Sequence, residues 1–221
     1  MNARRQTAVN VLDYQVKRDS VVKYSPLNME QRNRLKQILA EKSVGRGDFT
    51  LASGKKSSFY VDAKMTTLDP EGITYVADLV WQHLQSLPTF PKAIGGLATG
   101  ADPIVAEVVA LSFRRGGPSV YGFYVREEAK GHGTRKSVEG YAGVHGDPVV
   151  IVDDVCTTGG SAIKAIERAK ENGWKVVATI CLVDREEGGR EAIERYCPFD
   201  ALFTADELLT ARDELLQKVH S

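Results

Sequence analysis

The chain has 221 residues, and its 29 Lys and Arg side chains are balanced by 29 Asp and Glu side chains, so the formal net charge is zero. Hydrophobic residues make up 43% of the chain and charged residues 26%, ordinary values that exclude a disordered or collagen-like chain. Because the chain is neutral, we expect neither nucleic acid nor an anionic membrane as a partner. An anionic ligand would be bound by a local arrangement of charges or backbone dipoles.

The cysteines and the first residues bear on the compartment. Cys156, Cys181 and Cys197 are odd in number and lack CxxC spacing, which argues against a disulfide framework or a zinc site. No apolar stretch approaches the ~18 residues of a membrane helix. The first 20 residues are basic but lack the apolar segment of a secretory signal, although a transit peptide remains an alternative. We expect a cytoplasmic protein in which residues 1–27 are an N-terminal extension.

The next part of the chain, residues 28–92, is predicted to form helices and a small extended unit. Apolar side chains recur at helical spacing over Asn28–Lys42, and Asn28 is placed to cap that helix. An extended stretch ends at Phe59–Asp62, and Pro70–Leu87 indicates a second amphipathic helix.

From residue 93 onward, short apolar runs alternate with helical segments. The apolar runs are Ala93–Leu97, Val120–Val125, Val149–Val152, Val176–Val183 and Ala201–Phe203. The predicted helices are Pro103–Arg114, Ser161–Asn172 and Arg190–Tyr196. Continuous β-branched runs between helices are typical of parallel strands buried on both faces. We therefore predict the α/β fold class, with a parallel twisted sheet flanked by helices over residues 93–221.

One stretch, Arg126–Gly146, does not follow this alternation. It is long, charged and rich in glycine, with little apolar periodicity. Loops of this length in compact domains are usually functional lids or disordered segments. We predict a mobile loop at about residues 126–146, and by itself the stretch is as consistent with a solvated excursion as with a lid.

The segment with the clearest chemistry is Val149–Ala169. Its apolar strand leads to two adjacent carboxylates, Asp153 and Asp154, and the turn Thr157–Ser161 then opens a helix. Glycines let the backbone approach a ligand, and amides at a helix N-terminus bind anions. The turn is neither a P-loop nor a Rossmann fingerprint, because GK[ST] and GxGxxG are both absent. A plain strand–turn–helix with capping hydroxyls is the structural alternative.

This segment closely resembles the 5-phosphoribosyl 1-pyrophosphate (PRPP) signature of type I phosphoribosyltransferases. The resemblance implies that Asp153 and Asp154 contact the ribose hydroxyls and that the turn binds the 5′-phosphate. The PRPP-binding residues that it implies in this segment are Asp153, Asp154, Val155, Cys156, Thr157, Thr158, Gly159, Gly160 and Ser161. It also implies Mg²⁺ as the cofactor, held through PRPP or pyrophosphate without a firm protein ligand, and a small N-terminal hood beside the sheet.

Three further segments, Phe49–Asp62, Arg126–Gly133 and Leu182–Gly189, are similar to segments of the orotate phosphoribosyltransferase family. This resemblance implies a pentosyltransferase of pyrimidine biosynthesis that transfers the phosphoribosyl group from PRPP to orotate, giving orotidine 5′-monophosphate and pyrophosphate. The residues implied to contact orotate are Thr157 and Arg185 and, through backbone groups, Tyr60 and Val61.

The family resemblance also gives the loop a role. Arg126, Lys130 and His132 are implied to contact PRPP, and the predicted catalytic residues are Lys130, His132, Asp153 and Asp154. Cations that close over the leaving pyrophosphate would stabilise the charge that develops there, and a lid would exclude water. In the family this loop reaches the neighbouring subunit, which implies a homodimer.

The sequence departs from one version of the family pattern at three positions. Ala52, Gly100 and Glu127 stand where some members have lysine. Two rival functions remain: a phosphoribosyltransferase acting on adenine, hypoxanthine or uracil, and a regulatory PRPP-binding protein that binds nucleic acid without catalysis.

Overall fold

A computed structural model describes residues 29–50, 56–127 and 137–219 of the chain, and the structural statements below concern these ranges. The helices are α1 (Met29–Lys42), α2 (Lys64–Thr67), α3 (Pro70–Ser86), α4 (Asp102–Arg115), α5 (Gly160–Glu171), α6 (Gly189–Ile193) and α7 (Ala205–Val219). The strands are β1 (Val44–Thr50), β2 (Lys56–Val61), β3 (Ala93–Leu97), β4 (Tyr121–Val125), β5 (Val138–Gly140), β6 (Pro148–Cys156), β7 (Lys175–Asp184) and β8 (Phe199–Thr204). Over these ranges, no helix combines the length and apolarity needed to cross a membrane.

The central sheet has six strands in the order β5-β4-β3-β6-β7-β8. All neighbouring pairs are parallel except β4 and β5, which are antiparallel. From β3 the chain adds β4 on one side, whereas β6 pairs on the other side of β3 and is followed outward by β7 and β8. The order of strands therefore reverses between β3 and β6, and in open α/β sheets ligands bind beyond the strand ends at such a point.

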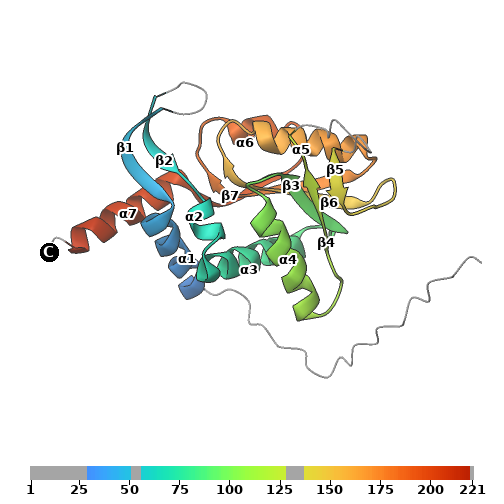
Figure 1. Cartoon of the computed structure of the whole chain (residues 1–221), viewed down its shortest axis with the longest axis horizontal. Coiled ribbons are helices and arrows are strands. Elements are labelled where there is room, and N and C mark those ends of the chain that lie inside the picture. Colours follow the sequence, from blue (N-terminus) through green and yellow to red (C-terminus); the bar gives the residue numbers. More distant parts are fainter. Residues whose placement is uncertain (1–28, 51–55, 128–136, 220–221) are drawn as a thin grey trace, which may run out of the picture.

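Both faces of the sheet are covered by helices (Figure 1). Helices α3 and α4 lie on one side of the sheet, and α5 lies on the other. The alternation of side chains along β6 supplies both layers: Val150 and Val152 belong to the core with α3 and α4, whereas Val149 and Ile151 belong to the core with α5. This two-sided burial explains why the strands are continuous apolar runs.

Helix α3 shows how local sequence sets a helix boundary. The Asp69 side chain caps the helix by accepting hydrogen bonds from the backbone amides of Glu71 (3.1 Å) and Gly72 (2.9 Å), and Pro70 occupies the first turn. Its buried face includes Val76, Val80 and Leu84, spaced at four residues. The amphipathic helix predicted at residues 70–87 is confirmed.

Most of the remaining predicted elements match the structure to within a few residues, but several differ. The predicted helix over residues 190–196 ends at Ile193, and the short helix α2 was not predicted. Asn28, predicted to cap the first helix, lies outside the described residues.

Strand β6 extends beyond the predicted apolar run, because its pairing with β7 continues to Cys156. The two carboxylates, Asp153 and Asp154, therefore lie within the strand and not after it. The predicted mobile loop of residues 126–146 is not wholly irregular, because Val138–Gly140 forms β5, whose Val138 side chain is buried. The C-terminal helix α7 was not predicted at all, although its Leu208 and Leu209 are buried.

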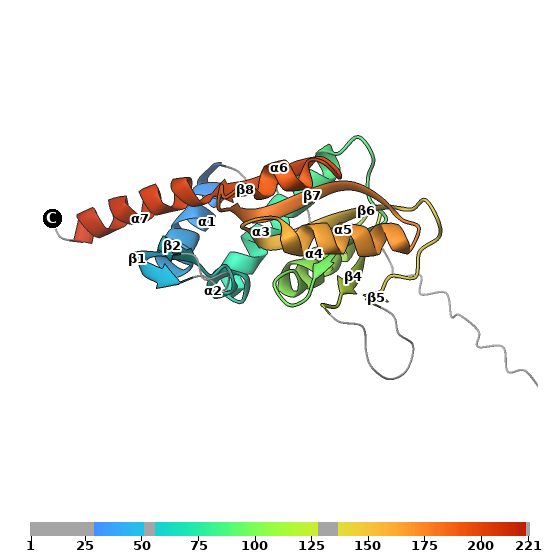
Figure 2. The ribbon, with the colours of Figure 1, turned by 90° about the horizontal axis from the view of Figure 1, so that it is seen from above.

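The N-terminal part forms the predicted hood beside the sheet. Strands β1 and β2 pair as an antiparallel hairpin in which Arg46 is opposite Phe59. Helix α7 runs alongside α1 and β1 (Figure 2), and the Arg212 side chain donates a 2.9 Å hydrogen bond to the carbonyl of Ala40. The end of the chain therefore holds the hairpin against the sheet domain. The division of the chain at residue 92 stays a prediction.

Candidate active site

Three strands of the sheet end at the same edge, and each is followed by a turn and a helix. Strands β3, β6 and β7 are neighbours, and their turns lead into α4, α5 and α6. The backbone amide of Arg185, the first residue after β7, donates a 2.9 Å hydrogen bond to the carbonyl of Cys156, the last residue of β6, so the two turns begin side by side. The predicted site residues on these two turns are therefore brought together.

The turn after β6, Thr157–Ser161, is called the phosphate turn below. Gly159 has a φ of +80° and stands as the N-cap of α5, a conformation that favours glycine. The first amides of α5 have no intrahelical acceptor, and the helix dipole adds partial positive charge there. Thr158, Gly160 and Ser161 are exposed, and Thr157 is half-buried. The turn can therefore accept a phosphate group on its solvent side.

Two residues named with this motif have side chains that face away from the turn. The side chain of Cys156 is buried and belongs to the core beneath α5, and Val155 packs against the opposite core. Any contact that they make with PRPP would come from the backbone.

Asp153 and Asp154 lie in different environments although they are adjacent. Asp153 is 6% exposed, and its Oδ1 accepts the backbone amide of Asp154 at 3.1 Å. Burial, with a smaller contribution from the neighbouring charge of Asp154, raises the pKa of Asp153 to about 8. Asp154 is half-buried, and its Oδ1 accepts the amide of Val155 at 2.9 Å. Asp154 is therefore the better placed of the two to contact a ligand as a carboxylate.

The turn after β3 lies against Asp154. A Cβ atom added at Gly100 would be 2.4 Å from Oδ1 of Asp154, so the absence of a side chain at this position lets the turn approach the carboxylate. The peptide bond between Ala98 and Thr99 in this turn is cis. The lysine that some family members carry at position 100 would not fit beside Asp154 in this conformation.

Arg185, predicted to contact orotate, sits at the end of β7 in a group that we call the Arg185 cluster: Ser57, Phe59, Arg185 and Glu187. Its side chain is 4% exposed, and its Nη2 lies 2.7 Å from Oε1 of Glu187. The same nitrogen donates to Oγ of Ser57 at 3.2 Å, and the guanidinium carbon lies 4.5 Å from the centre of the Phe59 ring. The hood strand β2 and the end of β7 thus meet at this arginine.

The predicted contacts Tyr60 and Val61 follow the alternation of β2. Tyr60 is 38% exposed, and its ring lies edge-on against Phe49 across the hairpin at 4.8 Å. Val61 is half-buried and packs on the core, as does Phe59. The side chains that reach Arg185 are thus Ser57 and Phe59 and not Tyr60. The sequence reasoning missed these two and Glu187, although the period-two alternation of β2 would have placed Ser57 and Phe59 on one face.

Some of the predicted loop residues lie within the described part of the chain, and others lie outside it. The Arg126 guanidinium forms two 2.9 Å hydrogen bonds to the Glu139 carboxylate on β5, which raises the pKa of Arg126. Glu127 is exposed. Lys130 and His132, as well as Ala52 in the hood segment, lie outside the described residues.

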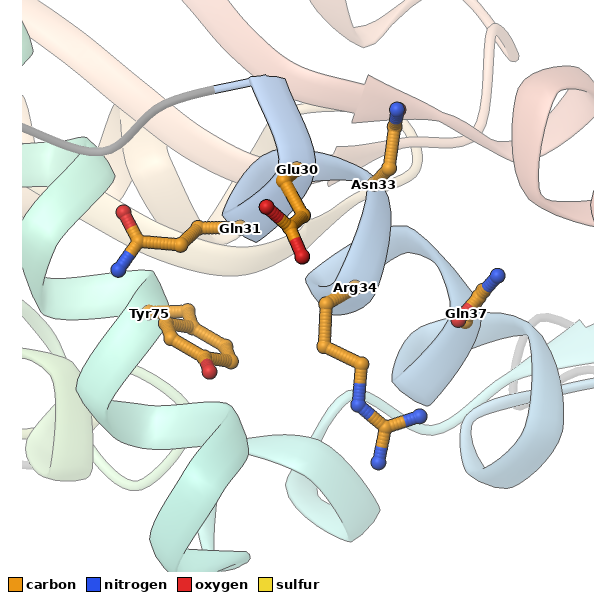
Figure 3. A pocket seen from close by; sticks show the side chains of 6 residues that line it. All are labelled: Glu30, Gln31, Asn33, Arg34, Gln37 and Tyr75. Carbon is orange, nitrogen blue, oxygen red and sulfur yellow. The ribbon is translucent and has the colours of Figure 1, made fainter.

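A separate pocket of about 530 Å³ lies between α1 and α3 (Figure 3). Its lining residues are Glu30, Gln31, Asn33, Arg34, Gln37 and Tyr75. Arg34 is engaged in two hydrogen bonds with Glu71, at 2.9 and 3.0 Å. None of the lining residues belongs to the strand ends, and we locate the site at the strand ends because the motifs converge there.

Comparisons with known proteins agree with this geometry. The chain matches the model of the phosphoribosyl transferase domain over residues 66–198. Over 182 residues it is 45% identical to an orotate phosphoribosyltransferase of Rhodopseudomonas palustris, covering 80% of this chain and 96% of that protein. It is 40% identical over 185 residues to an orotate phosphoribosyltransferase of Aquifex aeolicus, covering 82% and 99%.

A solved structure is also similar. The crystal structure of Mycobacterium tuberculosis orotate phosphoribosyltransferase in complex with PRPP matches with a TM-score of 0.66 and 29% identity, over 80% of this chain and 98% of that one. The parallel sheet and the turn after its acidic strand end define a phosphoribosyltransferase of type I. Within that class, the chain belongs to the orotate phosphoribosyltransferase family.

Proposed function

We propose that the protein catalyses transfer of the 5-phosphoribosyl group from PRPP to orotate, giving orotidine 5′-monophosphate and pyrophosphate. The observation that carries the proposal is the adjacency of the phosphate turn and the Arg185 cluster, because the Arg185 amide donates a 2.9 Å hydrogen bond to the carbonyl of Cys156, the residue immediately before the turn. An anion-binding turn and an arginine beneath the hood are adjacent, as a sugar phosphate and an anionic base require. The names of the similar proteins support the same reaction.

In the reaction, a bond forms between N1 of orotate and C1′ of the ribose, and the bond from C1′ to pyrophosphate breaks. We expect positive charge to develop at the sugar in the transition state. Asp154, as a half-buried carboxylate, would bind the ribose hydroxyls and favour this charge. The phosphate turn would anchor the 5′-phosphate and thereby place C1′ for attack. Orotate is already an anionic base, so the reaction needs no protein nucleophile.

The donor set fits Mg²⁺ as the cofactor. The half-buried Asp154 carboxylate could supply an oxygen ligand, which this ion prefers, whereas most of its coordination would come from PRPP and from the several waters that it usually retains. The described ranges contain no cluster of three side chains suited to hold a metal, so the remaining ligands would be oxygens of PRPP and water. When bound, the ion would neutralise charge on the leaving pyrophosphate.

The test of the substrate is UV-monitored consumption of orotate in the presence of PRPP and Mg²⁺. Turnover with orotate but not with adenine, hypoxanthine or uracil is the expected result. Turnover only with another base would overturn the assignment of the substrate. A salt-dependent shift of RNA or DNA without orotate turnover would instead favour the regulatory alternative.

We also propose that the active protein is a homodimer in which the loop around Lys130 completes the partner's site. A mixture of Lys130→Ala and Arg185→Ala chains tests this, because a mixed dimer would contain one site with both residues intact. With random exchange of subunits, the mixture should recover about a quarter of the wild-type activity. If each loop serves its own subunit's site, the mixture will stay as inactive as the two variants.

A further inference from the structure

The Arg185 side chain is held on several sides by residues that none of the sequence motifs assigns to it. Its Nε donates to Oε1 of Glu187 at 2.9 Å, and Nη2 lies 2.7 Å from the same oxygen. Nη2 also donates to Oγ of Ser57 at 3.2 Å. The Phe59 ring covers one face of the guanidinium at 4.5 Å. The arginine is therefore fixed before any substrate arrives.

The hydroxyl of Ser57 is itself oriented. Its Oγ donates a 2.7 Å hydrogen bond to the carbonyl of Phe59, which leaves the oxygen lone pairs as acceptors for Arg185. This local hydrogen bond within β2 couples the conformation of the hood strand to the position of the arginine.

A guanidinium is planar, so fixing Nε and Nη2 also fixes the direction of Nη1. Among the described residues, Nη1 has no hydrogen-bond partner, whereas Nε and Nη2 both have one. One nitrogen is thus left to contact a ligand, and its direction is set by the other two.

We propose that Glu187 and Ser57 are positioning residues that hold Arg185 with Nη1 directed at the anionic edge of the pyrimidine. This inference rests on the proposed function, because it names orotate as the ligand. The role of Glu187 is to orient the arginine and not to attract the base, since a carboxylate opposes the binding of another anion. Preorganised groups of this kind need no reorientation when the substrate binds.

The arginine–glutamate pair formed by Arg190 and Glu194, at helix α6, provides a control for the pair formed by Arg185 and Glu187. Arg190 also lies over an aromatic ring, at 4.7 Å from the Phe199 ring centre, and its Nη1 is 3.5 Å from Oε1 of Glu194. This arginine is more open than Arg185, with a side chain 40% exposed compared with 4%. Glu194→Ala removes the same kind of pair outside the cluster.

The experiment measures kcat and the KM values for orotate and PRPP, together with thermal midpoints. Glu187→Ala should raise the KM for orotate about 10-fold and change that for PRPP less than about 2-fold, as expected when a charge-assisted hydrogen bond to a buried arginine is lost. Glu187→Gln keeps an oxygen acceptor without the charge and should stay within about 3-fold of wild type. Ser57→Ala should raise the KM for orotate about 3-fold, and Ser57→Thr should restore it. Glu194→Ala should change neither KM.

A double-mutant cycle separates positioning from a general structural effect. In an Arg185→Ala background, Glu187→Ala should have no further effect on the KM for orotate, because its role acts through the arginine. An undiminished effect in that background would overturn the proposal, as would equal changes in both KM values or a Glu187→Gln variant as impaired as Glu187→Ala. If wild-type protein turns over orotate and Glu187→Ala matches it, only the positioning role fails. If wild-type protein does not use orotate, the proposed function fails and the inference with it.

Discussion

The phosphate turn and the Arg185 cluster lie side by side but are built in different ways. The turn consists of consecutive residues, Thr157–Ser161, between one strand and the helix that follows it. The cluster joins Ser57 and Arg185, which are 128 residues apart in the chain. The turn offers mainly backbone amides, whereas the cluster offers a side chain held by other side chains.

This difference predicts how each region responds to change. A site made of backbone amides depends on local conformation, and it tolerates side-chain substitution where the space is open. A site made of a held arginine depends on the packing of the hood against the sheet. Substitutions of exposed side chains in the phosphate turn should therefore change the KM for PRPP little. Substitutions in the Arg185 cluster should change the KM for orotate more.

The largest expected effect concerns a residue in neither region. Lys130→Ala should lower kcat about 100-fold or more and change both KM values much less, because the cation is expected to act on charge that develops on pyrophosphate. Steady-state kinetics with orotate and PRPP would measure this. Wild-type turnover in the variant would show that the loop assignment is wrong.

The second largest effect is expected at Gly189, where α6 begins against the end of β6 and the start of the phosphate turn. A Cβ atom at Gly189 would lie 2.3 Å from Sγ of Cys156 and 2.8 Å from the carbonyl oxygen of Thr157. Gly189→Ala should therefore lower the free energy of unfolding by about 1–3 kcal/mol and raise the KM for both substrates. Gly160→Ala is the control for folding, because the nearest atom to its Cβ is 4.0 Å away. An effect of Gly189→Ala on one substrate alone would mean that the two regions are independent.

A third prediction uses the buried carboxyl beside the phosphate turn. Since the pKa of Asp153 is raised to about 8, the folded protein retains a proton that the unfolded chain loses near pH 4. The free energy of unfolding should fall as the pH rises between these values, by up to about 1.4 kcal/mol per pH unit, and Asp153→Asn should remove this slope. Denaturant titrations at several pH values would measure it.

Asp147 provides a control of opposite sign. The hydrogen bond from Tyr141 lowers the pKa of Asp147, so its contribution to stability is lost as the pH falls. An unchanged slope above pH 4 in Asp153→Asn would contradict the assignment of the raised pKa to that residue.

A smaller effect is expected at the turn after β3. In Gly100→Ala the added methyl group would displace the Asp154 carboxylate and weaken its 2.9 Å hydrogen bond from Val155. We expect the KM for PRPP to rise about 5-fold, in line with one lost hydrogen bond, with little change for orotate. The KM for PRPP of Gly100→Lys should be no lower than that of Gly100→Ala. A lower KM for PRPP in the lysine variant would show that the Asp154 carboxylate can move away from position 100 without weakening PRPP binding.

The smallest effect is expected far from both regions. Arg46 of β1 forms hydrogen bonds to Asp213 of α7, the shortest at 2.8 Å, but both side chains are exposed. Exposed pairs contribute little because solvent and salt screen them. Arg46→Gln should leave the thermal midpoint and the KM for orotate near their wild-type values. A marked rise in that KM would show that the hood depends on this ion pair and not on apolar packing.

Much of the fold follows from patterns within short stretches of sequence. The strands β3, β6 and β7 and the helices between them were predicted because burial on both faces demands continuous apolar runs. The helix α7 and the short strand β5 were not predicted. Strand β5 has three residues and depends on pairing with the edge strand β4, which local sequence does not reveal.

The site also has a part that local sequence determines and a part that depends on long-range contacts. The sequence by itself determined the phosphate turn and its carboxylates, because a strand, a turn and a helix place consecutive residues together without help from the rest of the chain. Only the tertiary structure decided that Ser57 and Glu187 hold Arg185, that Gly100 lies against Asp154, and that Asp153 is buried enough to retain its proton. These features arise from the order of strands and from the hood meeting the sheet, and such long-range contacts leave no local pattern in the sequence.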